Sequence, residues 1–241
     1  MRISRIFTES QLKTQQTVNL DSRSSHYVST VLRLKLGSEV ILFNNDGFQY
    51  RAVIHAIEKK IVTVFVQYCE NISNESDLQI HLAIAVSKGD RMDWVVQKAT
   101  ELGVTSITPL RSERTTIKLN AERLEKKRRH WHQIIISASE QCGRNTLVQL
   151  SHLQVFDDWI TTVEADKKVI LHHQSEYQLR ATEATSSVAL LIGPEGGFSE
   201  EEITRAKSQQ FYSLRLGPRV MRTETAPLAA IAILQSLWGD M

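Results

Sequence analysis

Hydrophobic residues follow two different patterns along this chain. In about the first 70 residues, short segments rich in β-branched and aromatic side chains alternate with polar turns. These segments are Val40–Phe43, Tyr50–Ile57 and Ile61–Tyr68, and their composition favours β-strands. His26–Leu34 has helical spacing instead. This part of the chain therefore predicts a small β-barrel with one helical piece.

From residue 78 onward, predicted strands and helices alternate. Ile80–Val86 is a continuous apolar run, of the kind buried in parallel sheets. Gly89–Leu102 has apolar residues at helical spacing, and Thr105–Leu110 returns as a strand. A longer helix around 124–138 and a strand at Val169–His172 follow. This alternation predicts an α/β domain whose parallel sheet is covered by helices on both faces.

Composition is that of an ordinary globular protein with two domains. The chain has 241 residues, of which 41% are hydrophobic and 23% charged. The polar segment Asn71–Asp77 lacks periodicity and is the predicted linker, which places the domains at residues 1–71 and 72–241. No apolar run approaches the length of a membrane span, and the N-terminus does not resemble a secretory signal, so we expect a cytoplasmic protein without membrane contact.

The two cysteines, Cys69 and Cys142, are far apart and outside any metal-binding spacing. The adjacent His172 and His173 have no cysteine or carboxylate constellation beside them. We therefore expect neither a disulfide nor a metal site.

Two segments near the C-terminus combine a strand, a glycine turn and a helix start. In Leu190–Ile203, an apolar run leads into Gly193–Gly197, and Ser199 with Glu202 fits a capping box. The glycines allow positive φ angles and close approach of the backbone to a ligand. This segment predicts a strand, a tight turn and a helix in that order.

The second segment, Leu216–Ala226, repeats this arrangement. Phe211–Leu216 is a predicted strand, and Thr223 or Thr225 is the predicted cap of a helix that accepts Pro227 only in its first turn. Two such loops at the same edge of a parallel sheet would face one crevice.

Neither loop carries a phosphate-binding motif. The sequence GPEGG lacks both the Gly-Lys-Ser/Thr of a P-loop and the GxGxxG of a dinucleotide site. The carboxylate of Glu195 would also repel a phosphate. A ligand that is neutral or cationic where it meets this loop fits better.

These motifs resemble one family. GPEGGFSEEEI at 193–203 and LGPRVMRTETAPLAAIAILQ at 216–235 are similar to motifs of the 16S rRNA uridine N3-methyltransferases, S-adenosylmethionine-dependent enzymes of the knotted SPOUT class. MRISRIF at 1–7, SKGDRMDWVVQKATELGV at 87–104 and SASEQCGRN at 137–145 also match, in the family's order. The resemblance therefore covers almost the whole chain.

The resemblance implies the fold and the reaction. It implies a PUA-like RNA-binding β-barrel followed by a trefoil-knotted methyltransferase domain that forms a homodimer. The implied reaction is transfer of a methyl group to N3 of a uridine in 16S rRNA of the small ribosomal subunit, at position 1498 in this family.

The resemblance also implies a cofactor site formed by three loops. Backbone groups of such loops can bind adenine and ribose, whereas the structural alternative is that the glycines only permit tight turns. The matching positions are Leu171, His172, Ile192, Gly193, Pro194, Glu195, Gly196, Gly197, Leu216, Gly217, Val220, Met221 and Arg222.

Arg222, Thr223 and Glu224 follow the second glycine turn and are the predicted catalytic residues. Arg222 could stabilise negative charge on a uracil oxygen as N3 loses its proton. Glu224 could accept that proton or anchor Arg222, and water is a further candidate base. The structural alternative is an Arg222–carboxylate pair that stabilises the turn.

The distribution of charge indicates an anionic partner. The net charge is only +2, but residues 111–144 hold nine Lys or Arg against four Asp or Glu. A solvated helix face explains the run at 126–129 equally well, and surface ion pairing could explain single arginines. The predicted RNA contacts are Arg2, Arg5, Arg23, Arg33, Arg91 and Arg144.

Two functions from other classes compete with this interpretation. A noncatalytic RNA-binding or ribosome-assembly factor could keep the fold, but loss of the GPEGG or RTET residues would be expected, and both are present. A nucleotide-dependent enzyme on a doubly wound sheet would need the phosphate motifs that are absent.

Overall fold

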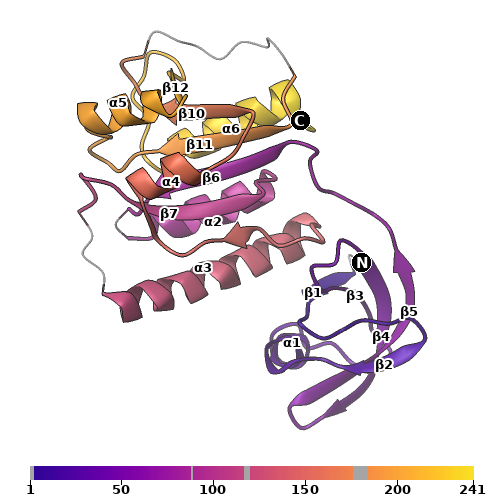
Figure 1. Ribbon diagram of the computed structural model, residues 1–241. Coiled ribbons are helices and arrows are strands. Elements are labelled where there is room, and N and C mark those ends of the chain that lie inside the picture. The colour runs from indigo at the N-terminus through magenta and orange to yellow at the C-terminus, as the bar shows by residue number, and fades with distance from the viewer. Residues whose placement is uncertain (1–2, 88, 117–119, 176–183) are drawn as a thin grey trace. The chain divides into compact units, whose positions relative to one another are not determined.

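The computed structural model describes residues 3–87, 89–116, 120–175 and 184–241 (Figure 1). The chain divides into two compact units. One comprises Met1–Glu75 with Ile136–Leu147, and the other comprises Ser76–Ile135 with Val148–Met241. Each unit has a hydrophobic core of its own.

The first unit contains a five-stranded sheet in the order β1-β3-β4-β5-β2. β1 runs parallel to β3, and the other neighbours are antiparallel. Val40, Leu42, Ile54 and Val64 point into the core because alternate side chains of a strand face one side. The three predicted strands are confirmed. The strands are β1 (Ser4–Phe7), β2 (Gln16–Asn19), β3 (Glu39–Phe43), β4 (Gln49–Glu58) and β5 (Ile61–Glu70).

The helical piece of the first unit begins earlier than its hydrophobic spacing predicts. α1 spans Ser22–His26 and continues as a π-helical turn, η1, over Tyr27–Val31. Asp21 fixes the start, because its side chain accepts a hydrogen bond from the Ser24 amide at 2.9 Å.

A buried carboxylate explains why residues 136–147 belong to the first unit. Glu140, near the end of α3 (Ala121–Cys142), accepts hydrogen bonds at 3.0 Å from the Phe7 amide and from the Arg23 guanidinium. Burial raises the pKa of Glu140, while these two donors oppose the rise. The end of α3 is thereby tied to β1 and to α1.

The second unit is built on a parallel sheet in the order β12-β10-β11-β6-β7-β8, with β9 also beside β7. All of its strand pairs are parallel, so the carboxyl ends of the strands lie at one edge. The predicted strands of this unit are confirmed. The strands are β6 (Gln79–Ala85), β7 (Ser106–Arg111), β8 (Gln149–Leu150), β9 (Gln154–Val155), β10 (Lys167–Leu171), β11 (Ser187–Ile192) and β12 (Tyr212–Leu214).

Helices cover both faces of this sheet, as the alternating pattern predicts (Figure 1). On one face, Phe156 and Trp159 of α4 and Ile203 of α5 pack against Ala83 and Leu191 of the central strands. α2 and α6 contact each other and cover the opposite face. None of the helices in the described ranges is long and apolar enough to span a membrane. The bounds are α2 (Arg91–Glu101), α4 (Phe156–Thr162), α5 (Glu200–Ser208) and α6 (Thr225–Trp238).

The first backbone amides of α5 and α6 donate to different kinds of hydrogen-bond acceptor. The capping box of α5 is confirmed, because Ser199 Oγ accepts from the Glu202 amide and Glu202 Oε2 accepts from the Ser199 amide. The prediction that Thr223 or Thr225 caps α6 is wrong. Glu224 is the N-cap residue, and its side chain makes no cap bond. The Arg222 carbonyl instead accepts hydrogen bonds from the Thr225 and Ala226 amides, at 2.9 and 3.0 Å. Pro227 lies in the first turn, as predicted.

Candidate functional site

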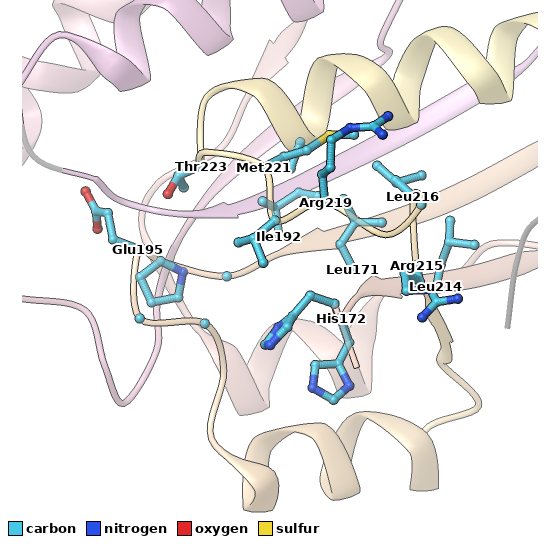
Figure 2. A pocket seen from close by; sticks show the side chains of 18 residues that line it. Leu171, His172, Ile192, Glu195, Leu214, Arg215, Leu216, Arg219, Met221 and Thr223 are labelled. Carbon is cyan, nitrogen blue, oxygen red and sulfur yellow. The ribbon is translucent and has the colours of Figure 1, made fainter. Parts of the chain in front are cut away.

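A pocket of about 270 Å³ opens at the carboxyl ends of three adjacent strands (Figure 2). β10 ends at Leu171, β11 at Ile192 and β12 at Leu214, and all three residues line it. Because these strands are parallel neighbours, the loops that follow them meet in one place. The predicted convergence of the two glycine loops on one crevice is confirmed.

The glycines of the 193–197 loop serve two purposes. A Cβ on Gly193 would lie 3.2 Å from the backbone of Gly197 and Phe198, so glycine allows closer packing here than a residue with a side chain. Gly197 has a φ of +68°, and no atom lies within 4 Å of where its Cβ would be. The turn is closed by a 2.8 Å hydrogen bond from the Gly197 amide to the Pro194 carbonyl. The loop therefore combines a tight turn with open space beside Gly197, where a ligand can approach the backbone closely.

The structure brings nearly all the predicted cofactor residues into this pocket. Only Arg222 of that set does not line it. The pocket lining gives the position of these residues and not their ligand, so cofactor binding by them stays a prediction. Five further residues line the pocket that were not predicted as site residues, although they lie within or directly beside the predicted segments; they are His173, Leu214, Arg215, Arg219 and Ala226.

The pocket carries opposite charges at its two ends. Glu195 and Thr223 lie at one end and Arg215 at the other (Figure 2). Arg219 adds a second cation to the lining. The Nε atom of Arg215 is buried and has no hydrogen-bond partner among the described residues. A buried donor of this kind has a hydrogen bond left for water or a ligand to accept.

His172 adds a side chain that is neutral at physiological pH. Burial lowers its pKa below the ordinary histidine range, and nearby His173 and Lys207 lower it further, while Glu200 opposes the shift. The pocket therefore gains an imidazole but no additional positive charge near neutral pH.

The three predicted catalytic residues are placed differently from one another. Thr223 lines the pocket, Arg222 is exposed outside it, and the Glu224 side chain is 21% exposed. Glu224 Oε2 is buried without a hydrogen bond, and its ionic partner is Arg91, whose Nε lies 3.7 Å away. No ion pair joins Glu224 to Arg222 among the described residues. The structure thus places Glu224 beside Arg91, and not beside Arg222 as the predicted anchoring role would require.

Arg91 connects both pocket loops. It is the first residue of α2, and its Nη1 donates to Glu195 Oε1 at 2.9 Å while its Nε faces Glu224. The residue predicted as a phosphate contact therefore holds one carboxylate from each loop.

The other predicted RNA contacts lie in the first unit, and most take part in its internal network. Arg5 donates to the Arg144 carbonyl at 3.0 Å and to Asn145, Arg144 binds Glu75, and Arg23 binds Glu140. These partners give the three arginines a structural role, and RNA contact by them stays a prediction. Arg33 is exposed, and Arg2 lies outside the described residues.

Metal-ligating side chains do not gather in the described part of the chain. No group of three or more His, Cys, Asp or Glu residues there could hold a metal ion. Neither Cys69 nor Cys142 takes part in a disulfide.

Comparisons with known proteins agree with this geometry. Residues 74–235 match the RNA methyltransferase domain family, and residues 20–67 match the RNA methyltransferase PUA domain family. Ribosomal RNA small subunit methyltransferase E of Buchnera aphidicola subsp. Schizaphis graminum is 35% identical, over 100% of this chain and 98% of that protein. The chain belongs to this methyltransferase family.

Other members of the family extend the comparison. The Bacillus subtilis methyltransferase E is 30% identical over 94% of this chain and 93% of its own. The Neisseria gonorrhoeae structure, bound to S-adenosyl methionine, aligns with a TM-score of 0.92 at 34% identity over 100% of both chains. A Legionella pneumophila methyltransferase in complex with the cofactor SAM aligns at 0.95 with 40% identity, also over 100% of both.

These matches confirm the family predicted from the motifs. They also confirm the fold class, an α/β methyltransferase fold of the SPOUT class with a PUA domain on its N-terminal side. Like its relatives, the chain is therefore an RNA methyltransferase family member in which the pocket at the ends of β10, β11 and β12 is the candidate active site.

Two adjacent glycines allow a test of the loop conformation. Gly197→Ala should lower the free energy of unfolding by about 1–2 kcal/mol, because alanine is strained at positive φ. Gly196→Ala is the matched control: its Cβ would meet the Arg114 side chain at an ordinary 3.6 Å, so the change should stay within about 0.5 kcal/mol. Urea unfolding measures both, and equal losses would contradict this account of the turn.

The depressed pKa of His172 predicts a pH dependence of stability. Its folded-state pKa lies below the unfolded value near 6.5, so the unfolded chain binds more protons as the pH falls through this range. The contribution of neutral His172 to the free energy of unfolding is complete above the unfolded-state pKa and is lost as the pH falls through the folded-state pKa. Between pH 7.5 and about 5.5, wild type should therefore lose more stability than His172→Gln in thermal unfolding. Parallel losses in the two proteins would show that His172 does not contribute.

Proposed function

We propose that this protein uses S-adenosylmethionine to methylate N3 of a uridine in the 16S rRNA of the small ribosomal subunit, at position 1498. The observation that carries the proposal is the meeting of the two glycine loops in one pocket, with Arg222, Thr223 and Glu224 directly after the second loop. The family relationship and the cofactor found in two related structures support it.

The residues of the pocket fit this cofactor. S-adenosylmethionine carries a sulfonium and an ammonium cation together with a carboxylate, and the pocket has Glu195 toward one end and Arg215 at the other. The unpartnered Nε of Arg215 would be satisfied by a carboxylate, and the open cradle at Gly197 admits close backbone approach. Leu171, Ile192 and Met221 supply the apolar surface that an adenine ring requires.

When bound, the cofactor supplies a methyl group on a good leaving group, so the protein has two remaining tasks. It must align the attacking nitrogen, and it must assist loss of the N3 proton. Arg222 is exposed beside the pocket, where its permanent charge can stabilise a uracil oxygen that becomes negative.

Glu224 is the candidate proton acceptor. Its buried Oε2 has no hydrogen-bond partner, and Arg91 at 3.7 Å keeps it oriented without a close hydrogen bond. Water remains the alternative acceptor once Arg222 has stabilised the anion.

The PUA domain is the proposed RNA-binding domain, with residues 1–71 as its extent and 72–241 as the methyltransferase domain. Arg33 is the exposed candidate contact of this domain. We expect the enzyme to act in the cytoplasm, where small subunits are assembled, and to form a homodimer through the knotted domain, as the family resemblance implies.

The deciding experiment is methyl transfer from radiolabelled S-adenosylmethionine to small ribosomal subunits from a strain that lacks this activity. Label recovered as N3-methyluridine is the expected result. Tight cofactor binding without transfer would refute the proposed RNA target, and absence of both would refute the methyltransferase assignment in favour of a noncatalytic RNA-binding factor.

Arg222→Ala should reduce kcat by about 100-fold or more, because it removes an electrostatic contact made to developing charge. Its affinity for S-adenosylmethionine, measured by calorimetry, should stay within about threefold of wild type. Arg205→Ala, at an exposed arginine of α5, is the control and should keep normal turnover. Unchanged turnover in Arg222→Ala would exclude the catalytic role.

A further inference from the structure

A second hollow lies beside the cofactor pocket and shares part of its wall. Its volume is about 810 Å³, and Asp90, Arg91 and Arg114 line it together with Glu195 and Gly196. Glu195 and Gly196 also line the cofactor pocket. A space of this size admits a nucleotide. The loop that forms the methyl-donor pocket therefore also bounds the space next to it.

The two arginines of this hollow differ in how their charges are compensated. Arg91 faces two carboxylates, Glu195 at 2.9 Å and Glu224 at 3.7 Å. Arg114 donates from Nη1 to the carbonyl oxygen of Gly196 at 2.9 Å, and no carboxylate in the described ranges lies within salt-bridge distance of it. The Gly196 carbonyl is neutral, so it does not compensate the positive charge of the Arg114 guanidinium. Arg114 is thus the group of the hollow that attracts an anion.

The loop that carries Arg114 is closed on itself. The Ser112 amide donates to Thr115 Oγ1 at 3.0 Å, and the Thr115 amide donates to the Ser112 carbonyl at 3.1 Å. These two bonds form a short turn with Glu113 and Arg114 at its tip. The turn limits the conformations open to Arg114.

The same turn is fixed to the start of α5. The Glu113 amide donates to Glu202 Oε1 at 2.8 Å, and Ser199 Oγ donates to Glu113 Oε2 at 2.7 Å. Ser199 and Glu202 are buried and also form the capping box. The loop after β7 and the loop after β11 are therefore joined through three side chains, which holds Arg114 over Gly196.

We propose that Arg114 binds a phosphate of the RNA beside the target uridine and so places that nucleotide against the methyl-donor pocket. The proposal rests on the proposed function and extends it to a residue outside the family-like motifs. A planar guanidinium suits the bidentate geometry of a phosphate, and its existing bond to Gly196 fixes its orientation. Arg91, whose charge is met by Glu195 and Glu224, is a positioning residue for those carboxylates.

The test compares Arg114→Ala and Arg114→Lys with Arg129→Ala, which removes the same charge from an exposed site on α3. Steady-state methylation of small subunits gives kcat and KM, and calorimetry gives the affinity for S-adenosylmethionine. Binding of a short single-stranded RNA that contains uridine is measured in parallel as a function of salt concentration, with cofactor present.

Arg114→Ala should raise KM about tenfold, change kcat by less than about threefold and leave cofactor affinity near wild type. The salt dependence of oligonucleotide binding should become shallower by about 0.7 in the log–log slope, as for one lost phosphate contact. Arg114→Lys should recover part of the KM, and Arg129→Ala should have a smaller effect on it.

Three results would overturn the assignment of Arg114. They are an unchanged KM and salt slope in Arg114→Ala, an equal loss in Arg129→Ala, or a loss of cofactor affinity that accounts for the defect. If wild type transfers no methyl group, the proposed function fails, and the oligonucleotide salt slopes still decide whether Arg114 binds RNA phosphate.

Discussion

The parallel pairing of β10 with both β11 and β12 is the constraint on which the candidate site depends. It puts the carboxyl ends of three strands at one edge, so that Leu171, Ile192 and Leu214 line a single pocket. A shift of one residue in any of these strands would exchange the core-facing and opposite side chains. The buried apolar positions of the strands therefore fix the site as firmly as they fix the sheet.

Ion pairs between loops then set the details of that site. Arg91 binds Glu195 from the first glycine loop and faces Glu224 from the second, so one guanidinium contacts both loops. Glu113 adds a further connection from the loop after β7 to the capping box of α5. These contacts give irregular loops a defined conformation, which catalysis by alignment requires.

The first unit shows a different use of charge. Glu140 is buried against the Phe7 amide and the Arg23 guanidinium, and Arg144 is buried against Glu75. Removing one member of such a pair leaves an uncompensated buried charge, which is more costly than losing a surface pair. The family-like segments at 1–7 and 137–145 thus contain residues that hold the unit together, in addition to any contact with RNA.

The sequence by itself determined the longer strands, the capping box of α5 and the family, because hydrophobic period, cap chemistry and loop motifs are local properties. The resemblance of the loop motifs to the family also indicated most pocket residues. The tertiary structure alone decided the partners of single charges. Glu224 pairs with Arg91 rather than with its neighbour Arg222, and Arg114 lies over Gly196, 82 positions away. Such pairings depend on which strand ends become neighbours in the sheet, and a one-dimensional pattern does not contain that information.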